Sequence, residues 1–237
     1  CRSQAEFFKD YICDVGTLLG AAAGQGKNIL FEAQLGALRD IDYGIYPFTS
    51  SSNTIASYAP IGAGIPGCAL DNVVGVMKAY STCVGEGPFA AETAMGEAWN
   101  EKLRESGGEF GAATGRPRRV GPFDAVASRY GIRCQKAQDI ALTKLDVLGA
   151  FDKIPVITGY RLHGVLLDSF PTDSRLEEAE PVIEELPGWG CDISGCRSWK
   201  DLPENARKYV CTLEKLVDHP IYLVSTGAER DAYLLRE

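Results

Sequence analysis

An arginine-rich loop is the part of this sequence best suited to binding an anion. Residues 108–119 read GEFGAATGRPRR, so a run of small residues leads into three arginines within four positions. Arginine donates hydrogen bonds in pairs to carboxylate and phosphate groups, and glycine lets backbone N–H groups approach a ligand closely. Thr114 adds a hydroxyl group, and Pro117 restricts the backbone between two arginines. The loop indicates a phosphate or carboxylate site; a solvated basic turn that pairs with surface carboxylates is the alternative that composition leaves open.

A strand-end segment carries a second possible site. Residues 141–148 read ALTKLDVL, so an apolar run ends at Thr143 and places Lys144 and Asp146 in the following loop. Open α/β sheets bind ligands at this position. An aspartate there can accept hydrogen bonds from both N1–H and the 2-amino group of guanine, whereas adenine has no such pair of donors, and the alkyl stem of Lys144 can cover the base. The alternative is a lysine and an aspartate that simply pair in solvent.

Another apolar run ends in hydroxyl groups and a glycine. Residues 223–227 read LVSTG, which by itself is typical only of a turn after a strand. If this turn lies beside Asp146, it completes a purine pocket.

A polar stretch follows the first apolar run of the chain. Residues 31–36 read FEAQLG and residues 40–53 read DIDYGIYPFTSSSN, so amide and hydroxyl donors are concentrated here. The stretch suits a polar ligand, and a capped, hydroxyl-rich loop before the next helix is the alternative. Residues 84–89, VGEGPF, indicate a sharp connection with little catalytic content.

Short apolar runs alternate with helical patterns along the chain. Strands are predicted at residues 28–31, 73–80, 140–145, 154–160 and 221–224. Helices are predicted at residues 11–23, 91–105, 121–131 and 203–217. This alternation indicates an α/β fold with a largely parallel sheet and flanking helices. The acidic, proline-containing segment 169–190 is expected to cross the surface.

Length and charge limit the class of protein. The chain has 237 residues, of which 45% are hydrophobic, so it can bury a sizeable core. Its net charge of −8 argues against a general nucleic-acid-binding surface. There is no apolar run of about 18 residues, and the first thirty residues lack the pattern of a signal peptide. We therefore expect a cytoplasmic protein that binds neither membranes nor nucleic acid.

The cysteines do not form a recognisable metal or disulfide pattern. Eight cysteines are scattered along the chain, which favours reduced thiols. Cys191 and Cys196 form the closest pair, and no second pair with metal-ligand spacing accompanies them. His163 and His219 lie far from this pair in the sequence, so no metal site is predicted.

Taken together and in this order, these segments are similar to adenylosuccinate synthase, from about Tyr11 to the end of the chain. Supporting stretches are residues 75–80, 121–126, 184–189, 201–207 and 225–231. The resemblance implies the C-terminal portion of that family's P-loop-NTPase-like α/β fold, with residues 1–237 forming one domain that is incomplete at its N-terminus. The start at Cys1, without a methionine, fits this expectation.

The resemblance also implies a reaction. IMP and L-aspartate are joined with GTP hydrolysis: the 6-oxygen of IMP is phosphorylated and then displaced by the aspartate amine. The product is adenylosuccinate, N6-(1,2-dicarboxyethyl)-AMP, in de novo AMP biosynthesis. Mg²⁺ accompanies GTP, and the family enzyme is expected to be a cytoplasmic homodimer.

Site residues follow from the resemblance, motif by motif. The aspartate-binding loop is assigned to Ala112, Ala113, Thr114, Gly115, Arg116, Pro117 and Arg118. The IMP contacts are assigned to Gln34, Ser50 and Arg116. The GTP contacts are assigned to Arg118, Lys144, Leu145, Asp146, Ser225, Thr226 and Gly227.

The sequence departs from the family pattern at two positions. The family's Glu-Gly-Ala-Gln-Gly is replaced by EAQLG at residues 32–36, which moves the amide one residue earlier, to Gln34. Ala113 stands where a second threonine is common, so Thr114 is expected to supply the hydroxyl near aspartate.

The family's proton-transfer residues have no counterpart in this sequence. Its phosphate loop, with a general-base aspartate and a lysine, and its general-acid histidine precede the matching segments. Neither His163 nor His219 lies in that motif, so no catalytic residue and no metal ligand is predicted here. We expect this chain to be inactive alone. The alternative is a non-catalytic fragment that binds guanine nucleotide or dimerises.

Overall fold

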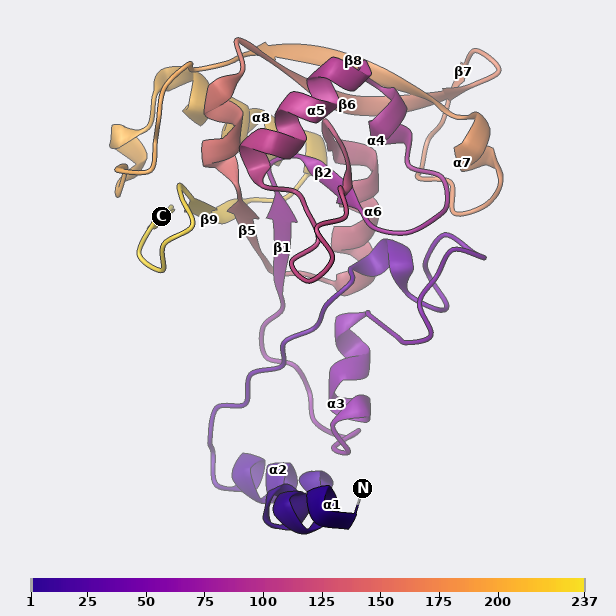
Figure 1. Cartoon of the computed structure of the whole chain (residues 1–237), viewed down its shortest axis with the longest axis vertical. Coiled ribbons are helices and arrows are strands. Elements are labelled where there is room, and N and C mark those ends of the chain that lie inside the picture. The colour runs from indigo at the N-terminus through magenta and orange to yellow at the C-terminus, as the bar shows by residue number, and fades with distance from the viewer. Residues whose placement is uncertain (1, 237) are drawn as a thin grey trace.

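The computed structural model describes residues 2–236, which fold around small sheets with helices packed against them (Figure 1). The central sheet consists of β1 (Val74–Lys78), β5 (Asp139–Thr143), β9 (Ile221–Ser225) and β10 (Tyr233–Leu235). The first three strands run parallel, and β10 pairs antiparallel with β9 at one edge. The predicted α/β class, with a largely parallel central sheet and flanking helices, is confirmed.

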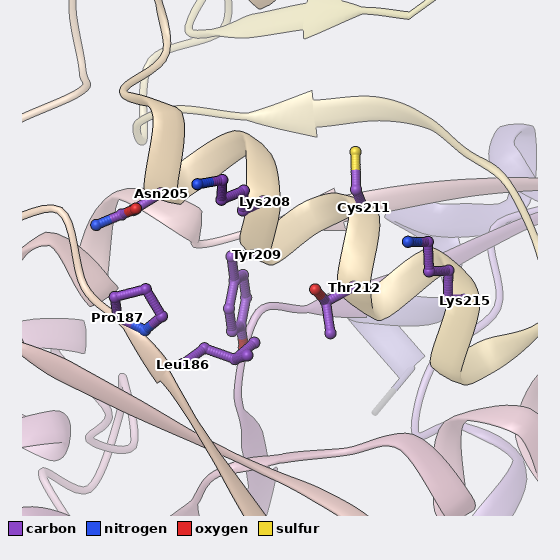
Figure 2. A pocket seen from close by; sticks show the side chains of 8 residues that line it. All are labelled: Leu186, Pro187, Asn205, Lys208, Tyr209, Cys211, Thr212 and Lys215. Atoms are coloured by element: carbon purple, nitrogen blue, oxygen red, sulfur yellow. The ribbon is translucent and has the colours of Figure 1, made fainter.

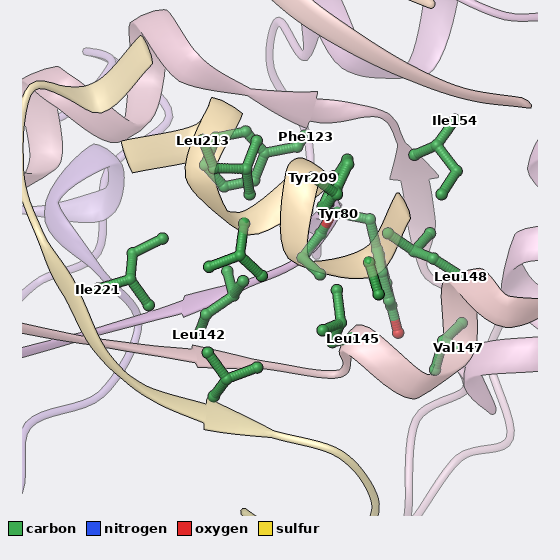
Figure 3. Packing of buried hydrophobic residues seen from close by; sticks show 14 of the residues in the cluster. Tyr80, Phe123, Leu142, Leu145, Val147, Leu148, Ile154, Tyr209, Leu213 and Ile221 are labelled. Carbon is green, nitrogen blue, oxygen red and sulfur yellow. Dashed lines mark hydrogen bonds between the residues drawn. The ribbon is translucent and has the colours of Figure 1, made fainter. Parts of the chain in front are cut away.

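The core forms where the central sheet meets the helices. Ile140 and Leu142 on β5 are fully buried, as expected for an inner strand of a parallel sheet. Helix α8 (Glu204–Val217) buries one face, on which Tyr209 and Leu213 lie four residues apart. Figure 3 shows Tyr209 and Leu213 of α8 facing Leu142 of β5 in one buried cluster. The helix predicted at residues 203–217 is therefore confirmed.

Two more helices pack against the sheets. Helix α5 (Glu97–Gly107) ends at Gly108, whose φ of 60° lies in the left-handed region that glycine adopts without strain. Helix α6 (Ala125–Gln135) is capped by Asp124, whose carboxylate accepts from two backbone N–H groups of the first turn. The helices predicted at 91–105 and 121–131 are present, with different starts. The first is preceded by the short α4 (Ala90–Thr93).

A second sheet runs across the top of the molecule as drawn in Figure 1. It consists of β4 (Phe123–Asp124), β6 (Lys153–Leu162), β7 (Val165–Leu166) and β8 (Glu180–Pro187). Strand β4 pairs parallel with β6, whereas β7 and β8 pair antiparallel with it. Residues 169–190 were expected to cross the surface, and β8 does so as an edge strand that pairs with β6. Its side chains are largely exposed or half-buried, and this edge position explains its acidic composition.

The first third of the chain has little regular structure. Helices α1 (Arg2–Phe8) and α2 (Val15–Gly24) lie at the end of the molecule opposite β6 and β8 (Figure 1). Helix α2 confirms most of the helix predicted at 11–23. The strand predicted at 28–31 is wrong: these residues form no ladder, and Leu30 is 91% exposed. An apolar run without a neighbouring strand has no partner for its backbone.

Short elements complete the described chain. The remaining helical turns are η1 (Lys9–Tyr11), η2 (Ala37–Arg39), η3 (Ala56–Tyr58), α3 (Ala59–Gly62), η4 (Leu145–Ala150), α7 (Arg175–Glu178) and η5 (Trp199–Asp201). Strands β2 (Ser81–Cys83) and β3 (Arg119–Gly121) form a separate antiparallel pair. This pair ties the end of the arginine-rich loop to the segment that follows β1.

Candidate functional site

The strand ends of the central sheet bring two predicted segments together. In the ladder, Leu142 of β5 pairs with Val224 of β9, so residues 143–146 and 225–227 leave the sheet at the same edge. On the other side of β5, Lys78 pairs with Thr143 and brings a lysine that sequence reasoning did not assign. Its signal was a charged residue at the end of an apolar run. The carboxyl edge of the sheet therefore carries polar groups from three strands.

Lys144 and Asp146 diverge after β5. Lys144 has a left-handed backbone, with φ of 63°, and its Nζ donates to the carbonyl oxygen of Gly107 at 2.8 Å. Leu145 is fully buried and anchors η4 beneath the loop. Burial raises the pKa of the Asp146 carboxyl, and the negative charge of Asp192 adds to the increase. Among the described residues, the two side chains form no ion pair, so the alternative of a simple Lys–Asp pair is wrong.

The turn after β9 presents its backbone to the same edge. The Ser225 hydroxyl donates to the Gly227 carbonyl at 2.9 Å, which closes a tight turn. Thr226 is fully buried, and its hydroxyl donates to the Cys196 carbonyl at 3.2 Å. The Thr226 side chain thus holds the turn in place, and its N–H donates to the Ala232 carbonyl at 2.8 Å, so the half-buried Ser225 and Gly227 are the accessible residues of the turn.

A loop that sequence reasoning missed borders this edge. The Asp192 carboxylate accepts from the backbone N–H and the hydroxyl of Ser194, each at 2.8 Å, and these bonds lower its pKa. A Cβ on Gly227 would lie 3.6 Å from the Ser194 Cβ, so the loop packs beside the turn after β9. An Asp-x-Ser turn is common in loops, and only the tertiary contact marks this one.

The arginine-rich loop is a short hairpin with an exposed tip. Phe110 and Pro117 form an isolated bridge, and the Gly111 N–H donates to the Arg116 carbonyl at 2.8 Å. Residues 112–117 are exposed, including all the small residues predicted to meet a ligand. Gly115 has φ of 65°, a conformation that suits glycine. The loop therefore offers Arg116 and the backbone amides of its tip to solvent.

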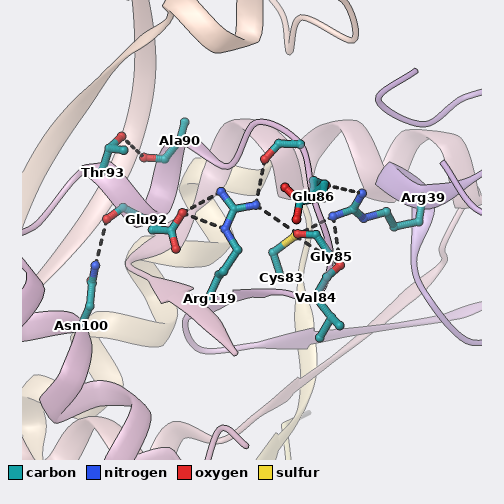
Figure 4. A network of polar contacts seen from close by, with 11 residues as sticks. Arg39, Cys83, Val84, Gly85, Glu86, Ala90, Glu92, Thr93, Asn100 and Arg119 are labelled. Atoms are coloured by element: carbon teal, nitrogen blue, oxygen red, sulfur yellow. Dashed lines mark hydrogen bonds and ion pairs between the residues drawn. The ribbon is translucent and has the colours of Figure 1, made fainter. Parts of the chain in front are cut away.

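The three arginines take different roles. Arg119 pairs with Glu92 at 2.6 Å and donates to the Gly87 carbonyl at 2.8 Å (Figure 4). The alternative of a basic residue paired with a nearby acid is therefore correct for Arg119. Arg118, in contrast, pairs at 2.9 Å with Glu109, whose side chain is only 2% exposed.

The buried Glu109 carboxylate accepts hydrogen bonds from two cations, Arg118 and Lys78, and from one tyrosine. Its Oε1 accepts from the Lys78 Nζ at 2.8 Å and from the Tyr80 hydroxyl at 2.6 Å. Burial disfavours the ionised carboxyl, but the bonds from Lys78 and Tyr80 outweigh burial and hold the pKa of Glu109 below its ordinary value. Burial in turn lowers the pKa of the Lys78 ammonium and raises that of the Tyr80 hydroxyl. No sequence pattern indicated this network, because Lys78 and Tyr80 lie 31 and 29 residues before Glu109.

The loop that carries Ser50 is organised by one buried carboxylate. Asp40 is fully buried and accepts from the backbone N–H groups of Thr54, Asp42, Tyr43 and Ile55. These bonds lower its pKa although burial opposes them. Ser50 lies half-buried, and its hydroxyl donates to the Ser52 carbonyl at 3.0 Å.

Gln34 lies in an exposed turn beside this loop. Its carbonyl accepts from the Gly36 N–H at 2.9 Å, and Leu35 between them has a left-handed backbone with φ of 71°. The Thr54 hydroxyl donates to the Gly36 carbonyl at 2.8 Å. The turn that carries Gln34 is therefore tied to the Ser50 loop.

Two arginines connect the Ser50 loop with the arginine-rich loop. Arg39 donates to the Glu86 carbonyl at 3.0 Å and to the Val84 carbonyl at 3.1 Å. Arg119 donates to the Gly85 and Gly87 carbonyls of the same turn (Figure 4). The connection predicted at residues 84–89 is thus the junction between the two loops.

Two cavities lie apart from the residues assigned from the sequence. A groove of about 240 Å³ lies between β8 and α8 and is lined by Lys208, Tyr209 and Lys215, among others (Figure 2). A second cavity of about 330 Å³ lies beside Tyr43 and Tyr130. Neither contains a residue assigned from the sequence, and within residues 2–236 no group of three or more His, Cys, Asp or Glu is arranged to hold a metal ion. No helix of the described chain is long and apolar enough to span a membrane.

Comparisons with known proteins agree on one family. A family model described as adenylosuccinate synthetase matches residues 1–234. The chain is 49% identical over 232 residues to adenylosuccinate synthetase from Trichlorobacter lovleyi, covering 98% of this chain and 54% of that relative. It is 46% identical to the enzyme from Pelotomaculum thermopropionicum, covering 99% and 55%. The chain therefore spans about half the length of the curated relatives it matches.

A solved structure is also similar. The structure of fully ligated adenylosuccinate synthetase from Plasmodium falciparum superposes with a TM-score of 0.92 and 36% sequence identity. The match covers 97% of this chain and 55% of that one.

Proposed function

Because the chain belongs to the adenylosuccinate synthetase family, we propose that it carries the guanine, IMP and aspartate recognition residues of a GTP-dependent carbon–nitrogen ligase. In this reaction GTP phosphorylates the 6-oxygen of IMP, and the aspartate amine then displaces that phosphate to give adenylosuccinate. The observation that carries the proposal is the shared edge of β5 and β9, where Asp146 and residues 225–227 leave the sheet together.

The guanine site is proposed at this edge. The Asp146 carboxylate accepts from N1–H and the 2-amino group, while the stem of Lys144 covers the base face. Leu145 holds the loop from below, and the turn at residues 225–227 supplies backbone groups at the rim. Partial burial of Asp146 favours a ligand that brings two donors, because such a ligand replaces the water lost by the carboxylate.

The anionic parts of the substrates are proposed to meet the arginine-rich loop. Arg116 stands at the exposed tip, where amides from residues 112–114 and the Thr114 hydroxyl can bind the carboxylates of L-aspartate, while the Gly115 N–H holds the turn by donating to the Gly111 carbonyl. Arg116 also faces IMP in this proposal, and Arg118 serves the GTP phosphates. Ser50 and Gln34 provide hydroxyl and amide contacts to IMP from the neighbouring loop.

Proton transfer and metal chemistry are assigned outside this sequence. Mg²⁺ is proposed to enter with GTP and to neutralise phosphate charge, and the described residues hold no cluster of ligands suited to it. Phosphoryl transfer depends mostly on positioning and electrostatic stabilisation. This chain therefore positions substrates, and the cytoplasmic homodimer proposed for the whole enzyme supplies the base, the acid and the metal ligands.

Calorimetry with GDP and with ADP tests the guanine site in this chain. We expect GDP to bind and ADP to bind at least about tenfold more weakly, because adenine lacks the donor pair that Asp146 accepts. Equal affinity for both nucleotides would refute the assignment of Asp146. If neither nucleotide binds, the chain is a structural or dimerisation fragment, which is part of the alternative given in the sequence analysis.

A turnover assay tests whether this chain lacks the proton-transfer residues. With IMP, L-aspartate, GTP and Mg²⁺, we expect no adenylosuccinate from this chain alone. Clear product formation would overturn the view that the proton-transfer residues lie elsewhere.

A further inference from the structure

A single buried carboxylate anchors the cations at the carboxyl edge of the sheet. Glu109 Oε1 accepts from Lys78 and Tyr80, and Oε2 accepts from Arg118 at 2.9 Å. The Glu109 side chain is 2% exposed, whereas those of Lys78 and Arg118 are 28% and 34% exposed. Lys78 and Arg118 are therefore bound to a buried carboxylate and remain partly exposed to solvent.

Each cation keeps donors beyond the one that Glu109 takes. A guanidinium carries five N–H donors and an ammonium carries three. Glu109 accepts one from Arg118 and one from Lys78, and Thr82 accepts a second from Lys78 at 3.1 Å. The geometry thus leaves donors for an anionic ligand while the direction of each side chain is fixed.

The backbone around Glu109 is tied to both proposed sites. The Glu109 carbonyl accepts from the Arg118 N–H at 2.9 Å, so these two residues are joined through main chain and side chain. Two residues earlier, the Gly107 carbonyl accepts from Lys144 of the guanine site. A Cβ on Gly107 would lie 2.5 Å from the Tyr80 hydroxyl oxygen, so this approach requires glycine. The end of α5 therefore links the base-binding loop with the arginine-rich loop.

We propose that Glu109 is a positioning residue that holds Arg118 and Lys78 in place for the phosphate groups of the guanine nucleotide, and that Lys78 is an additional phosphate contact. The inference rests on the proposed function, because it takes guanine nucleotide as the ligand. A buried carboxylate with three donors costs less than an unpaired one, and the bonds that satisfy it also fix the cations.

A purely electrostatic role for Glu109 predicts the opposite result. If its negative charge only offset the cations, removing it would strengthen phosphate binding. If it positions them, removing it weakens phosphate binding, because Arg118 and Lys78 lose their shared anchor and reorient. The direction of the change separates the two accounts.

The experiment compares guanosine with GDP on the 237-residue chain by calorimetry. The ratio of the guanosine Kd to the GDP Kd measures what the phosphates add to binding. For Glu109→Gln we expect this ratio to fall by about tenfold, since charge-assisted contacts are lost, while the guanosine Kd stays within about twofold. An unchanged or increased ratio would overturn the inference and leave the guanine site intact. Absence of guanosine binding to the parent chain would instead overturn the proposed function, and the inference with it.

Three further variants complete the comparison. Tyr80→Phe removes one donor to Glu109 without changing charge, and we expect a smaller fall of about threefold. Glu109→Asp keeps the charge but shortens the side chain, so we expect it to behave like Glu109→Gln. Glu92→Gln is the matched control, because Glu92 pairs with Arg119 of the same loop, and its ratio should not change. If Glu109→Gln does not give the circular dichroism spectrum of the parent, Tyr80→Phe decides, and an unchanged ratio in that variant contradicts the inference.

Discussion

Lys144 donates a 2.8 Å hydrogen bond from its Nζ to the carbonyl oxygen of Gly107, the last residue of α5. Lys144 and Gly107 are 37 positions apart, so this contact joins the strand-end loop to the helix that leads into the arginine-rich loop. A lysine in the left-handed conformation normally carries some strain, and the bond fixes its side chain across the top of the loop.

Replacement of Lys144 separates the two roles of its side chain. Lys144→Met keeps the alkyl stem that is proposed to cover the base but removes the bond to Gly107, whereas Lys144→Ala removes both. We expect GDP affinity to fall by about threefold in the first variant and by at least about tenfold in the second. Calorimetry measures both, and equal losses would show that the stem contributes nothing.

Replacement of Asp146 should change which base is preferred. In Asp146→Asn, one acceptor becomes a donor that opposes the 2-amino group of guanine and suits the 2-oxo group of xanthine. We expect GDP affinity to fall at least about tenfold and xanthosine diphosphate to bind better than GDP. A variant that still prefers GDP would place the base elsewhere. ADP serves as the control, since its weak binding should not change.

The buried Glu109 should make the fold sensitive to acid. Its pKa in the folded state is held below the ordinary value of 4.5 by Lys78 and Tyr80. The ionised form therefore stabilises the fold above the unfolded pKa, and this contribution is lost as pH falls through 4.5 toward the lower, folded value. Thermal unfolding between about pH 6 and about pH 3 measures the effect.

Glu109→Gln provides the comparison for that titration. The variant should be less stable than the parent near neutral pH, and it should lose less stability on acidification, because the group that titrates is gone. An identical acid dependence in both proteins would contradict the assignment.

Arg39 should stabilise the junction between the Ser50 loop and the turn at residues 84–87. Its guanidinium donates to carbonyl oxygens of Glu86, Val84 and Phe48. Arg39→Met removes these three hydrogen bonds, of which the one to Phe48 is partly buried and the other two are exposed, so we expect the free energy of unfolding to fall by about 1–2 kcal/mol. Urea denaturation measures it.

Arg175→Met is the control for that loss. Within residues 2–236 the only ion pair of Arg175 is with Asp173, and both side chains are more than half exposed, at 58% and 54%. Surface pairs of this kind contribute about 0–1 kcal/mol. A loss at Arg39 no larger than the loss at Arg175 would show that the junction does not depend on the guanidinium.

Local sequence patterns predicted the strand-end site because its geometry follows from chain direction. Once β5 and β9 are parallel neighbours, residues 144–146 and 225–227 must leave the sheet together. The same patterns predicted no strand at β8, where an edge position allows acidic side chains. They predicted a strand at residues 28–31, which have no neighbouring strand. Pattern describes a segment, whereas pairing depends on a partner that the segment does not reveal.

The hydrogen bonds around Glu109 could not be predicted from local sequence patterns, for a related reason. A single glutamate after a Gly-Gly pair gives no sign that it is buried. Its partners Lys78 and Tyr80 become visible only when β1 lies beside the end of α5. The loop around Asp40, in contrast, has the hydroxyl-rich, capped form that the sequence offered as the alternative to a ligand site, and its contacts are mostly close in sequence.

That difference has a consequence for the order of folding. Asp40 draws its four N–H donors from residues no more than 15 positions away, so the loop closes over a short stretch of chain. Glu109 must instead meet donors 29 and 31 positions earlier, after β1 has joined its sheet. Short closures cost less chain entropy and form faster. The loop around Asp40 is therefore expected to form before the contacts of Lys78 and Tyr80 with Glu109.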